Sequence, residues 1–301
     1  MKKISLFTPC YNEEGNVYKL YNKVTEVMKS LPQYEYEYIF SDNCSTDDTP
    51  NILRKIASED KRVKVIFNMR NFGPSRSGAH GFFQTSGDAS ICLACDLQDP
   101  PELIPEFIKK WEEGYKVVLG QKKGTDESKI MSLCRKTYYK LIKAISDTPQ
   151  YEDITGYGLY DKEVVELLKS CNDPTPRFSN LIGEYGYDVA MIQFYKPSRN
   201  SGKSSYNFVR YFNEALHSIV TTSDVPIKSS FWACLIFAIL GTVEFFKKRK
   251  MMPNNRHNIA FLYYGIAGLF MYVGFIGSYI YNNYKILESH PLVIEKERIN
   301  F

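Results

Sequence analysis

Short β-rich runs alternate with segments of helical length through residues 1–120, and this rhythm limits the fold more than any other feature of the sequence. Five runs are predicted to be strands: Ile4–Thr8, Tyr36–Phe40, Val63–Phe67, Ala89–Ala94 and Lys116–Gly120. Strand–helix–strand alternation predicts an α/β fold with a mostly parallel sheet. Because ligands bind beyond the carboxyl ends of strands in such sheets, the loops after each strand are the places to look for a site.

The composition fits a packed domain with an anionic partner. The chain has 301 residues, 44% of them hydrophobic, and a net charge of +4. Such a charge suits a membrane surface or a phosphate-bearing substrate, and no other feature points to nucleic acid. Seven cysteines without paired spacing favour a reducing compartment, and no signal-peptide core precedes Pro9. The N-terminal domain is therefore expected in the cytosol.

The last third of the chain carries membrane-type patterns. Asn207–Thr221 places apolar side chains on one helical stripe, typical of a helix lying on a bilayer, with a surface helix packed on the domain as the alternative. Ile259–Ile280, about 22 residues without a charge, is long enough to span a membrane. Ile227–Phe246 is predicted as a second span, but Glu244 leaves a tilted hairpin arm or a re-entrant segment open. A basic cluster, Lys247–Lys250, follows, and its side of the membrane stays open.

These patterns divide the chain into four parts. We expect an α/β domain over residues 1–206 and an amphipathic juxtamembrane helix over residues 207–226. A transmembrane hairpin is expected over residues 227–281, followed by a cytosolic tail over residues 282–301.

Polar side chains follow four of the predicted strands, in the segments Thr8–Glu14, Ser41–Asp47, Arg70–Gly73 and Asp96–Pro101. A carboxylate after the second strand can accept hydrogen bonds from the base or ribose of a nucleotide, although Asp47 also suits helix capping. Asp96 is the hard oxygen ligand that Mg²⁺ or Mn²⁺ needs beside a diphosphate. A helix N-cap acid is the alternative for Asp96 taken alone.

Taken together, these motifs resemble glycosyltransferase family 2, with its Rossmann-like GT-A fold. Within it they resemble the polyisoprenyl-phosphate glycosyltransferases, which include dolichol-phosphate mannosyltransferase. The likeness covers nearly the whole chain and runs through these segments: Pro9–Glu14, Ser41–Asp47, Arg70–Gly73, Asp96–Glu102, Gly156–Asp161, the set Arg199, Gly202, Lys203, Ser204 and Tyr206, Ser223–Pro226, and Gly274–Pro291.

The resemblance implies roles for particular residues. The nucleoside of a nucleotide-sugar would be held by Pro9, Tyr11, Glu13 and Asp42. The cofactor, Mg²⁺ or Mn²⁺, and the diphosphate would be held by Asp96 and Gln98, and phosphates would be met by Arg135, Arg199 and Lys203. Asp96, Asp153 and Arg135 are the expected catalytic set.

Two departures from the family pattern affect these roles. Ala94 stands where the Asp-x-Asp metal motif has its first carboxylate, so metal binding would depend on Asp96, Gln98 and the donor phosphates. Gly156 stands where many relatives carry an acid proposed as a base, and Asp153 is the nearest substitute. A phosphate monoester is largely dianionic at neutral pH and is itself a nucleophile, so a strong base is not required.

The expected reaction is a single displacement at the anomeric carbon. It would invert the configuration and give a β-linked lipid-phosphate sugar from an α-linked donor. The resemblance favours a uridine donor, with guanosine as the alternative, and undecaprenyl phosphate as the acceptor in a bacterial cytoplasmic membrane. The product would serve cell-envelope glycan modification, and self-association through the spans is a further expectation.

Two other functions compete with this one. A processive polysaccharide synthase would carry a Gln-x-x-Arg-Trp motif, but Trp111 and Trp232 follow Lys110 and Phe231. A non-catalytic membrane scaffold that retained a nucleotide-sugar fold is the alternative from another class. Metal-dependent hydrolysis of the donor would separate an enzyme from such a scaffold.

Overall fold

The computed structural model describes residues 1–123, 153–171, 185–195, 271–281 and 291–301, together with a few isolated positions. The chain forms two compact units. The first contains Met1–Cys134, Pro149–Ser205 and Ser289–Phe301, and the second contains Arg135–Thr148 and Tyr206–Glu288.

The first unit is built on one eight-stranded sheet in the order β7-β5-β6-β4-β1-β2-β3-β8. Its strands are β1 (Lys2–Cys10), β2 (Tyr34–Asp42), β3 (Val63–Asn68), β4 (Ala89–Cys92), β5 (Val117–Lys122), β6 (Ile154–Asp161), β7 (Val189–Phe194) and β8 (Glu295–Ile299). Four neighbouring pairs are parallel, and the pairs β3–β8, β4–β6 and β5–β6 are antiparallel. The α/β class with a mostly parallel sheet is therefore confirmed, and each of the five predicted strands is present.

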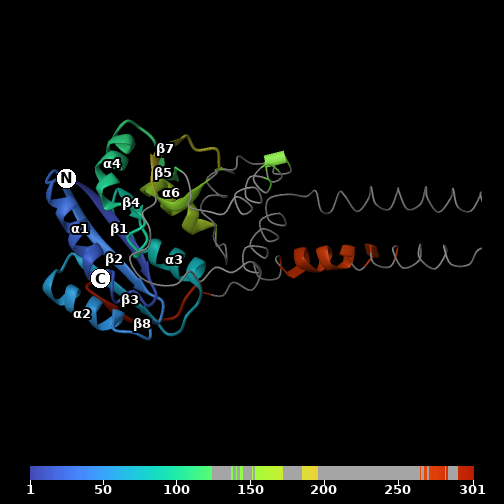
Figure 1. The fold of residues 1–301 in the computed structure, drawn as a ribbon, viewed down its shortest axis with the longest axis horizontal. Helices are drawn as coiled ribbons and strands as arrows, with labels where there is room; N and C mark the ends of the chain where they lie inside the picture. Colours follow the sequence, from blue (N-terminus) through green and yellow to red (C-terminus); the bar gives the residue numbers. More distant parts are fainter. Residues whose placement is uncertain are drawn as a thin grey trace, which may run out of the picture. The chain divides into compact units, whose positions relative to one another are not determined.

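Helices cover both faces of this sheet (Figure 1). On one face lie α1 (Val17–Lys29), α2 (Thr49–Glu59) and α4 (Ile104–Glu112), which follows a short 3₁₀ turn, η1 (Pro101–Leu103). On the other face lie α3 (Pro74–Phe82) and α6 (Lys162–Ser170). The buried residues of α1 recur every three or four positions, the spacing of an apolar stripe turned toward a core: Val17, Leu20, Val24 and Met28.

The central strands are buried on both faces, because each face carries its own hydrophobic core. Along β2, Tyr38 and Phe40 pack in the core beneath α1, α2 and α4, whereas Ile39 packs in the core beneath α3 and α6. This burial explains why β2 carries three large apolar residues in succession, Tyr38–Phe40, in place of a strict apolar–polar alternation.

In the second unit, residues 271–281 are helical. Large apolar side chains on this stretch are exposed, among them Met271, Val273, Ile276 and Ile280. Among the residues that are described, no helix has both the length and the apolar character needed to cross a membrane. The predicted amphipathic helix and the span Ile227–Phe246 lie outside the described residues, as does most of the first half of Ile259–Ile280.

Candidate active site

The loops that follow β1, β2 and β4 meet at one edge of the sheet, the edge formed by the carboxyl ends of these strands. They meet there because β1 lies between the other two strands and runs parallel to both. Cys10, at the end of β1, is paired with Asp42, at the end of β2. On the other side of β1, Phe7 pairs with Cys92, the last residue of β4. The predicted nucleoside and diphosphate residues therefore gather where parallel α/β sheets bind their ligands.

Asp42 is the most buried acid of this edge, with 2% of its surface exposed. One carboxylate oxygen, Oδ2, accepts a hydrogen bond from the backbone N–H of Ser45 at 3.1 Å. The other, Oδ1, is buried and has no hydrogen-bond partner among the described residues. Burial raises the pKa of Asp42, and the hydrogen bonds from Ser45 oppose that rise. A buried acceptor left without a partner is costly, and an N–H or O–H group of a nucleoside would satisfy it.

The loop after β1 is bound to the loop after β2 by reciprocal hydrogen bonds. The backbone N–H of Asn12 donates to Ser45 Oγ at 2.9 Å, and the backbone N–H of Thr46 donates to Asn12 Oδ1 at 2.8 Å. The backbone N–H of Asp48 donates to Glu14 Oε2 at 2.9 Å. These contacts fix the two loops beside Asp42 before any ligand binds, which lowers the entropy cost of binding.

The other predicted nucleoside residues differ in what they offer a ligand. Pro9 is half-buried within β1, opposite Ser41. Tyr11, the first residue after β1, is 46% exposed, so its ring is accessible. Glu13 Oε2 accepts a hydrogen bond from Asn16 Nδ2 at 2.7 Å, and this contact stabilises the start of α1. The role of Glu13 toward the nucleoside stays a prediction.

Asp96 and Gln98 lie in a tight turn after β4. Asp96 is half-buried, and its Oδ1 accepts a hydrogen bond from the backbone N–H of Gln98 at 3.2 Å. Leu97 between them has a φ of 60°, which turns the chain sharply. Asp99 Oδ2 accepts a hydrogen bond from the backbone N–H of Ala94 at 2.9 Å. Over the described ranges, no three His, Cys, Asp or Glu side chains form a cluster suited to a metal ion.

Asp153 lies at the same edge of the sheet. Strand β6 runs antiparallel to β4, with Gly158 opposite Cys92, so the residue before β6 lies beyond the carboxyl end of β4. The backbone of Asp153 has a φ of 58°, and its carbonyl accepts a hydrogen bond from the N–H of Lys122 at 2.9 Å. Gly156 has a φ of 84°, a conformation that favours glycine. Arg135, Arg199 and Lys203 lie outside the described residues.

A buried amide network beside Asp42 did not emerge from the sequence. Asn43 Oδ1 accepts hydrogen bonds from Asn68 Nδ2 at 3.2 Å and from the backbone N–H of Phe72 at 3.0 Å. Asn68 Nδ2 also donates to Ser77 Oγ at 2.9 Å. The only signal in the sequence is a polar residue at the end of an apolar strand, and such residues are also common at ordinary turns.

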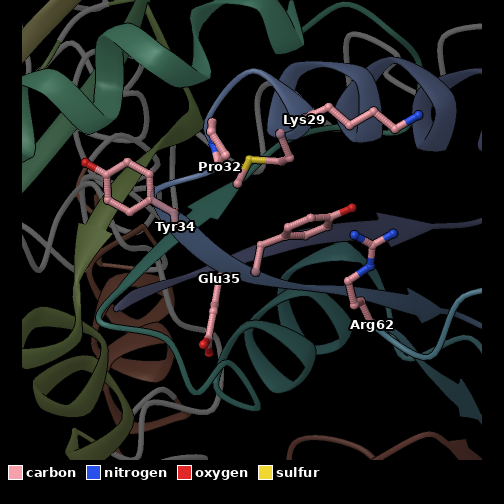
Figure 2. Close-up of a pocket in the computed structure, with 7 residues that line it drawn as sticks. Lys29, Pro32, Tyr34, Glu35 and Arg62 are labelled. Atoms are coloured by element: carbon pink, nitrogen blue, oxygen red, sulfur yellow. The ribbon is translucent and has the colours of Figure 1, made fainter.

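A cavity of about 450 Å³ lies at the other end of the strands. It is lined by the end of α1, the start of β2 and Arg62, which precedes β3; Figure 2 shows Lys29, Pro32 and Tyr34 around it. The guanidinium of Arg62 lies over the ring of Tyr36, 4.6 Å from its centroid, and is bound by Asp60. None of the predicted site residues lines this cavity.

Comparisons with known proteins identify the family of this chain. Residues 5–168 match the family model described as Glycosyl transferase family 2, a region that contains the loops after β1, β2, β3 and β4. The chain belongs to glycosyl transferase family 2. This family 2 protein is therefore a glycosyltransferase, as the resemblance of its motifs to the family predicted. The relatives reported below do not support the alternative of a non-catalytic scaffold.

Two curated relatives match this glycosyltransferase along almost its whole length. It is 32% identical to the bactoprenol glucosyl transferase of Shigella phage SfX, over 98% of this chain and 99% of that protein. It is 30% identical to the prophage bactoprenol glucosyl transferase homolog of Escherichia coli strain K12, over 98% of each chain. The solved mannosyl-3-phosphoglycerate synthase of Rubrobacter xylanophilus is similar in fold, with a TM-score of 0.50 and 12% identity over 84% of this chain and 78% of that one.

Proposed function

We propose that this glycosyltransferase moves a sugar from a nucleotide-sugar to a polyisoprenyl phosphate at a membrane surface. The observation that carries the donor half of the proposal is the buried carboxylate of Asp42, whose Oδ1 has no partner among the described residues at the ligand-binding edge of the sheet. The acceptor half is supported by full-length relatives that are named bactoprenol glucosyl transferases.

The donor's nucleoside is proposed to bind between the loops after β1 and β2. The Oδ1 atom of Asp42 would accept a hydrogen bond from the base or the ribose, and the exposed ring of Tyr11 would contact a flat face of the nucleoside. The hydrogen bonds that join the two loops hold both groups in place. A uridine donor is proposed from the resemblance, with guanosine as the alternative.

A divalent cation, Mg²⁺ or Mn²⁺, fits the residues present after β4. Mg²⁺ commonly binds through one or two carboxylates together with substrate phosphates, so Asp96 alone can serve where Ala94 replaces a first carboxylate. Gln98 supplies a neutral oxygen two residues away. When bound, the cation would neutralise the charge that develops on the departing diphosphate.

The acceptor phosphate is proposed to attack the anomeric carbon directly. The second pKa of a phosphate monoester is near 6, so the acceptor is largely dianionic at neutral pH and needs no strong base. The protein then has to hold the attacking oxygen in line with the leaving diphosphate. A single displacement inverts the anomeric configuration, so an α-linked donor gives a β-linked product.

The membrane half of the proposal rests on the sequence and the relatives. Arg135, Arg199 and Lys203 are proposed to meet phosphates, and the apolar C-terminal segments are proposed to hold the enzyme in the bacterial cytoplasmic membrane. The catalytic domain would face the cytosol. Undecaprenyl phosphate is the proposed acceptor, and the product would be used in modifying cell-envelope glycans.

A transfer assay with the full-length protein in detergent tests the proposal. Radiolabelled UDP-sugars and GDP-sugars are offered in parallel, with undecaprenyl phosphate as acceptor and undecaprenol as the control that lacks the nucleophilic phosphate. We expect label in the lipid phase only with the phosphorylated acceptor and a divalent cation, and a β-anomer by NMR. If no donor labels the phosphorylated lipid, the proposed acceptor is wrong.

A further inference from the structure

The end of the chain lies against the loop that joins β3 to α3. Strand β8 pairs antiparallel with β3 and brings Glu295 opposite Asn68, the last residue of β3 (Figure 1). The backbone N–H of Met69, the first residue of the loop, donates a hydrogen bond to the carbonyl of Ile294 at 3.0 Å. Residues 291–294 therefore continue past the end of β3, alongside the start of this loop.

Arg76, in the first turn of α3, binds the same segment through its side chain. Its Nε donates to the carbonyl of Leu292 at 2.9 Å, and its Nη2 donates to the carbonyl of Pro291 at 3.0 Å. The guanidinium also lies 5.6 Å from the centroid of the Phe72 ring, which belongs to the loop. The planar fork of arginine can hold two acceptors at once, so Arg76 joins the C-terminal segment to the start of α3 while its guanidinium lies near the Phe72 ring of the loop.

The other side of the loop is held from within the site. Asn43, the neighbour of Asp42, accepts a hydrogen bond from the backbone N–H of Phe72 at 3.0 Å and donates to Asn71 Oδ1 at 3.0 Å. Asn71 Oδ1 in turn accepts a hydrogen bond from the backbone N–H of Gly73 at 2.9 Å. The loop is thus fixed on one side by the residue next to Asp42 and on the other by the end of the chain.

We infer that the C-terminal segment 291–299 is a structural part of the donor site, and that Arg76 is a positioning residue for donor binding. Arg76 holds the loop 70–73 against the C-terminal segment, and the loop in turn holds Asn43 and the adjacent Asp42. The inference rests on the proposed function, because it assigns the nucleoside to the edge where Asp42 lies.

Loss of the Arg76 contacts should lower the fraction of molecules whose loop is ready to bind a nucleotide. The apparent dissociation constant rises in inverse proportion to that fraction. Two lost hydrogen bonds to backbone carbonyls predict a rise of about tenfold in the Kd for the nucleoside diphosphate and in the donor KM of Arg76→Ala. The kcat should change less than about twofold, because the role inferred for the loop is to hold the residues that bind the nucleoside. Arg76→Lys keeps the positive charge but lacks the planar guanidinium, so its Kd and donor KM should lie between those of the unmodified protein and those of Arg76→Ala.

Asn300→Gly is the matched control. Asn300, the residue after the C-terminal segment, is also bound to the domain. Its Nδ2 donates to the carbonyls of Ala57 at 2.7 Å and Val63 at 2.8 Å, and its Oδ1 accepts a hydrogen bond from Lys61 Nζ at 3.4 Å. Val63 begins β3, so these contacts lie at the opposite end of that strand from the loop. Glycine tolerates the φ of 60° at this position. The control should leave donor KM unchanged.

Two measurements on the full-length protein test the inference. Titration calorimetry with UDP or GDP and Mn²⁺ should show the tenfold weakening in Arg76→Ala and none in Asn300→Gly. Hydrogen exchange should show faster exchange of the Phe72 and Gly73 amides in Arg76→Ala only, with unchanged protection in β1 and β2. Equal affinities in Arg76→Ala and the unmodified protein, or equal weakening in both variants, would overturn the inference. If the unmodified protein binds neither nucleotide, the proposed donor function fails instead, and hydrogen exchange still reports whether Arg76 holds the loop.

Discussion

Replacing Glu37 by glutamine tests the electrostatics of the sheet with a defined magnitude. Glu37 lies within β2, five residues before Asp42, and is 2% exposed. Its carboxylate binds Lys3 Nζ and Lys64 Nζ, each at 2.8 Å, and accepts hydrogen bonds from Ser5 Oγ at 2.6 Å and from the backbone N–H of Ser86 at 2.8 Å. Burial raises the pKa of Glu37, but the two lysines and the serines lower it more, to about 2.

The depressed pKa of Glu37 sets the size and the pH range of the effect. A fall of the pKa from 4.5 to about 2 corresponds to about 3 kcal/mol of stability at neutral pH. The lysine side chains keep 33% and 21% of their surface exposed, so solvent screening reduces the expected loss in Glu37→Gln to about 2 kcal/mol. Because the folded pKa is the lower one, this stability is complete above pH 4.5 and is lost as pH falls toward 2.

Chemical denaturation at several pH values, followed by tryptophan fluorescence, measures the difference between the unmodified protein and Glu37→Gln. We expect about 2 kcal/mol at pH 7 and a difference that shrinks steadily below pH 4.5, since glutamine resembles the protonated carboxyl. Glu35→Gln is the control, because Glu35 is exposed on the same strand, and it should change little. A difference that stays constant from pH 7 to pH 3 would refute the argument.

Three further predictions follow from the site and its packing. Asp42→Asn should raise the melting temperature of the ligand-free protein. Burial raises the pKa of Asp42, so the unmodified protein loses stability as the pH rises through that pKa, and asparagine removes this loss. Calorimetry should also show about tenfold weaker nucleotide binding by Asp42→Asn. Gly81→Ala should lower the free energy of unfolding by about 1–3 kcal/mol, because its Cβ would lie 2.5 Å from the Phe7 ring. Gly78→Ala, on the same helix, meets nothing within 4 Å and should raise the free energy of unfolding by about 0.5–1 kcal/mol, as measured by denaturation. Asp153→Asn should lower kcat less than about tenfold, and a loss above a hundredfold would identify Asp153 as a general base.

The sheet could be predicted from the sequence because its strands are buried on both faces. Each of β1, β2 and β3 carries a short run of buried apolar residues, Leu6–Phe7, Tyr38–Phe40 and Val65–Phe67, and ends at polar loop residues. Strand β8 gave no such signal. Its sequence alternates charges, Glu295-Lys296-Glu297-Arg298, as expected for an edge strand whose side chains are partly solvated.

The donor edge was predictable in outline but not in detail. The strand ends were enough to place the loops that carry Asp42 and Asp96 at the same edge of the sheet. The partners of Asn43 depend on contacts between segments far apart in the chain, and Arg76 binds residues more than two hundred positions away. Contacts of this kind have no local sequence pattern, so only the folded structure reveals them.

The rate of sugar transfer by Asp96→Ala tests the central claim most directly. Initial rates of label transfer from the active donor to undecaprenyl phosphate are measured with saturating Mn²⁺, beside Glu106→Ala, which removes an exposed acid from α4. The account predicts a loss of about a hundredfold or more in Asp96→Ala and an unchanged rate in Glu106→Ala. An Asp96→Ala enzyme that glycosylates the lipid as fast as the unmodified protein would contradict it.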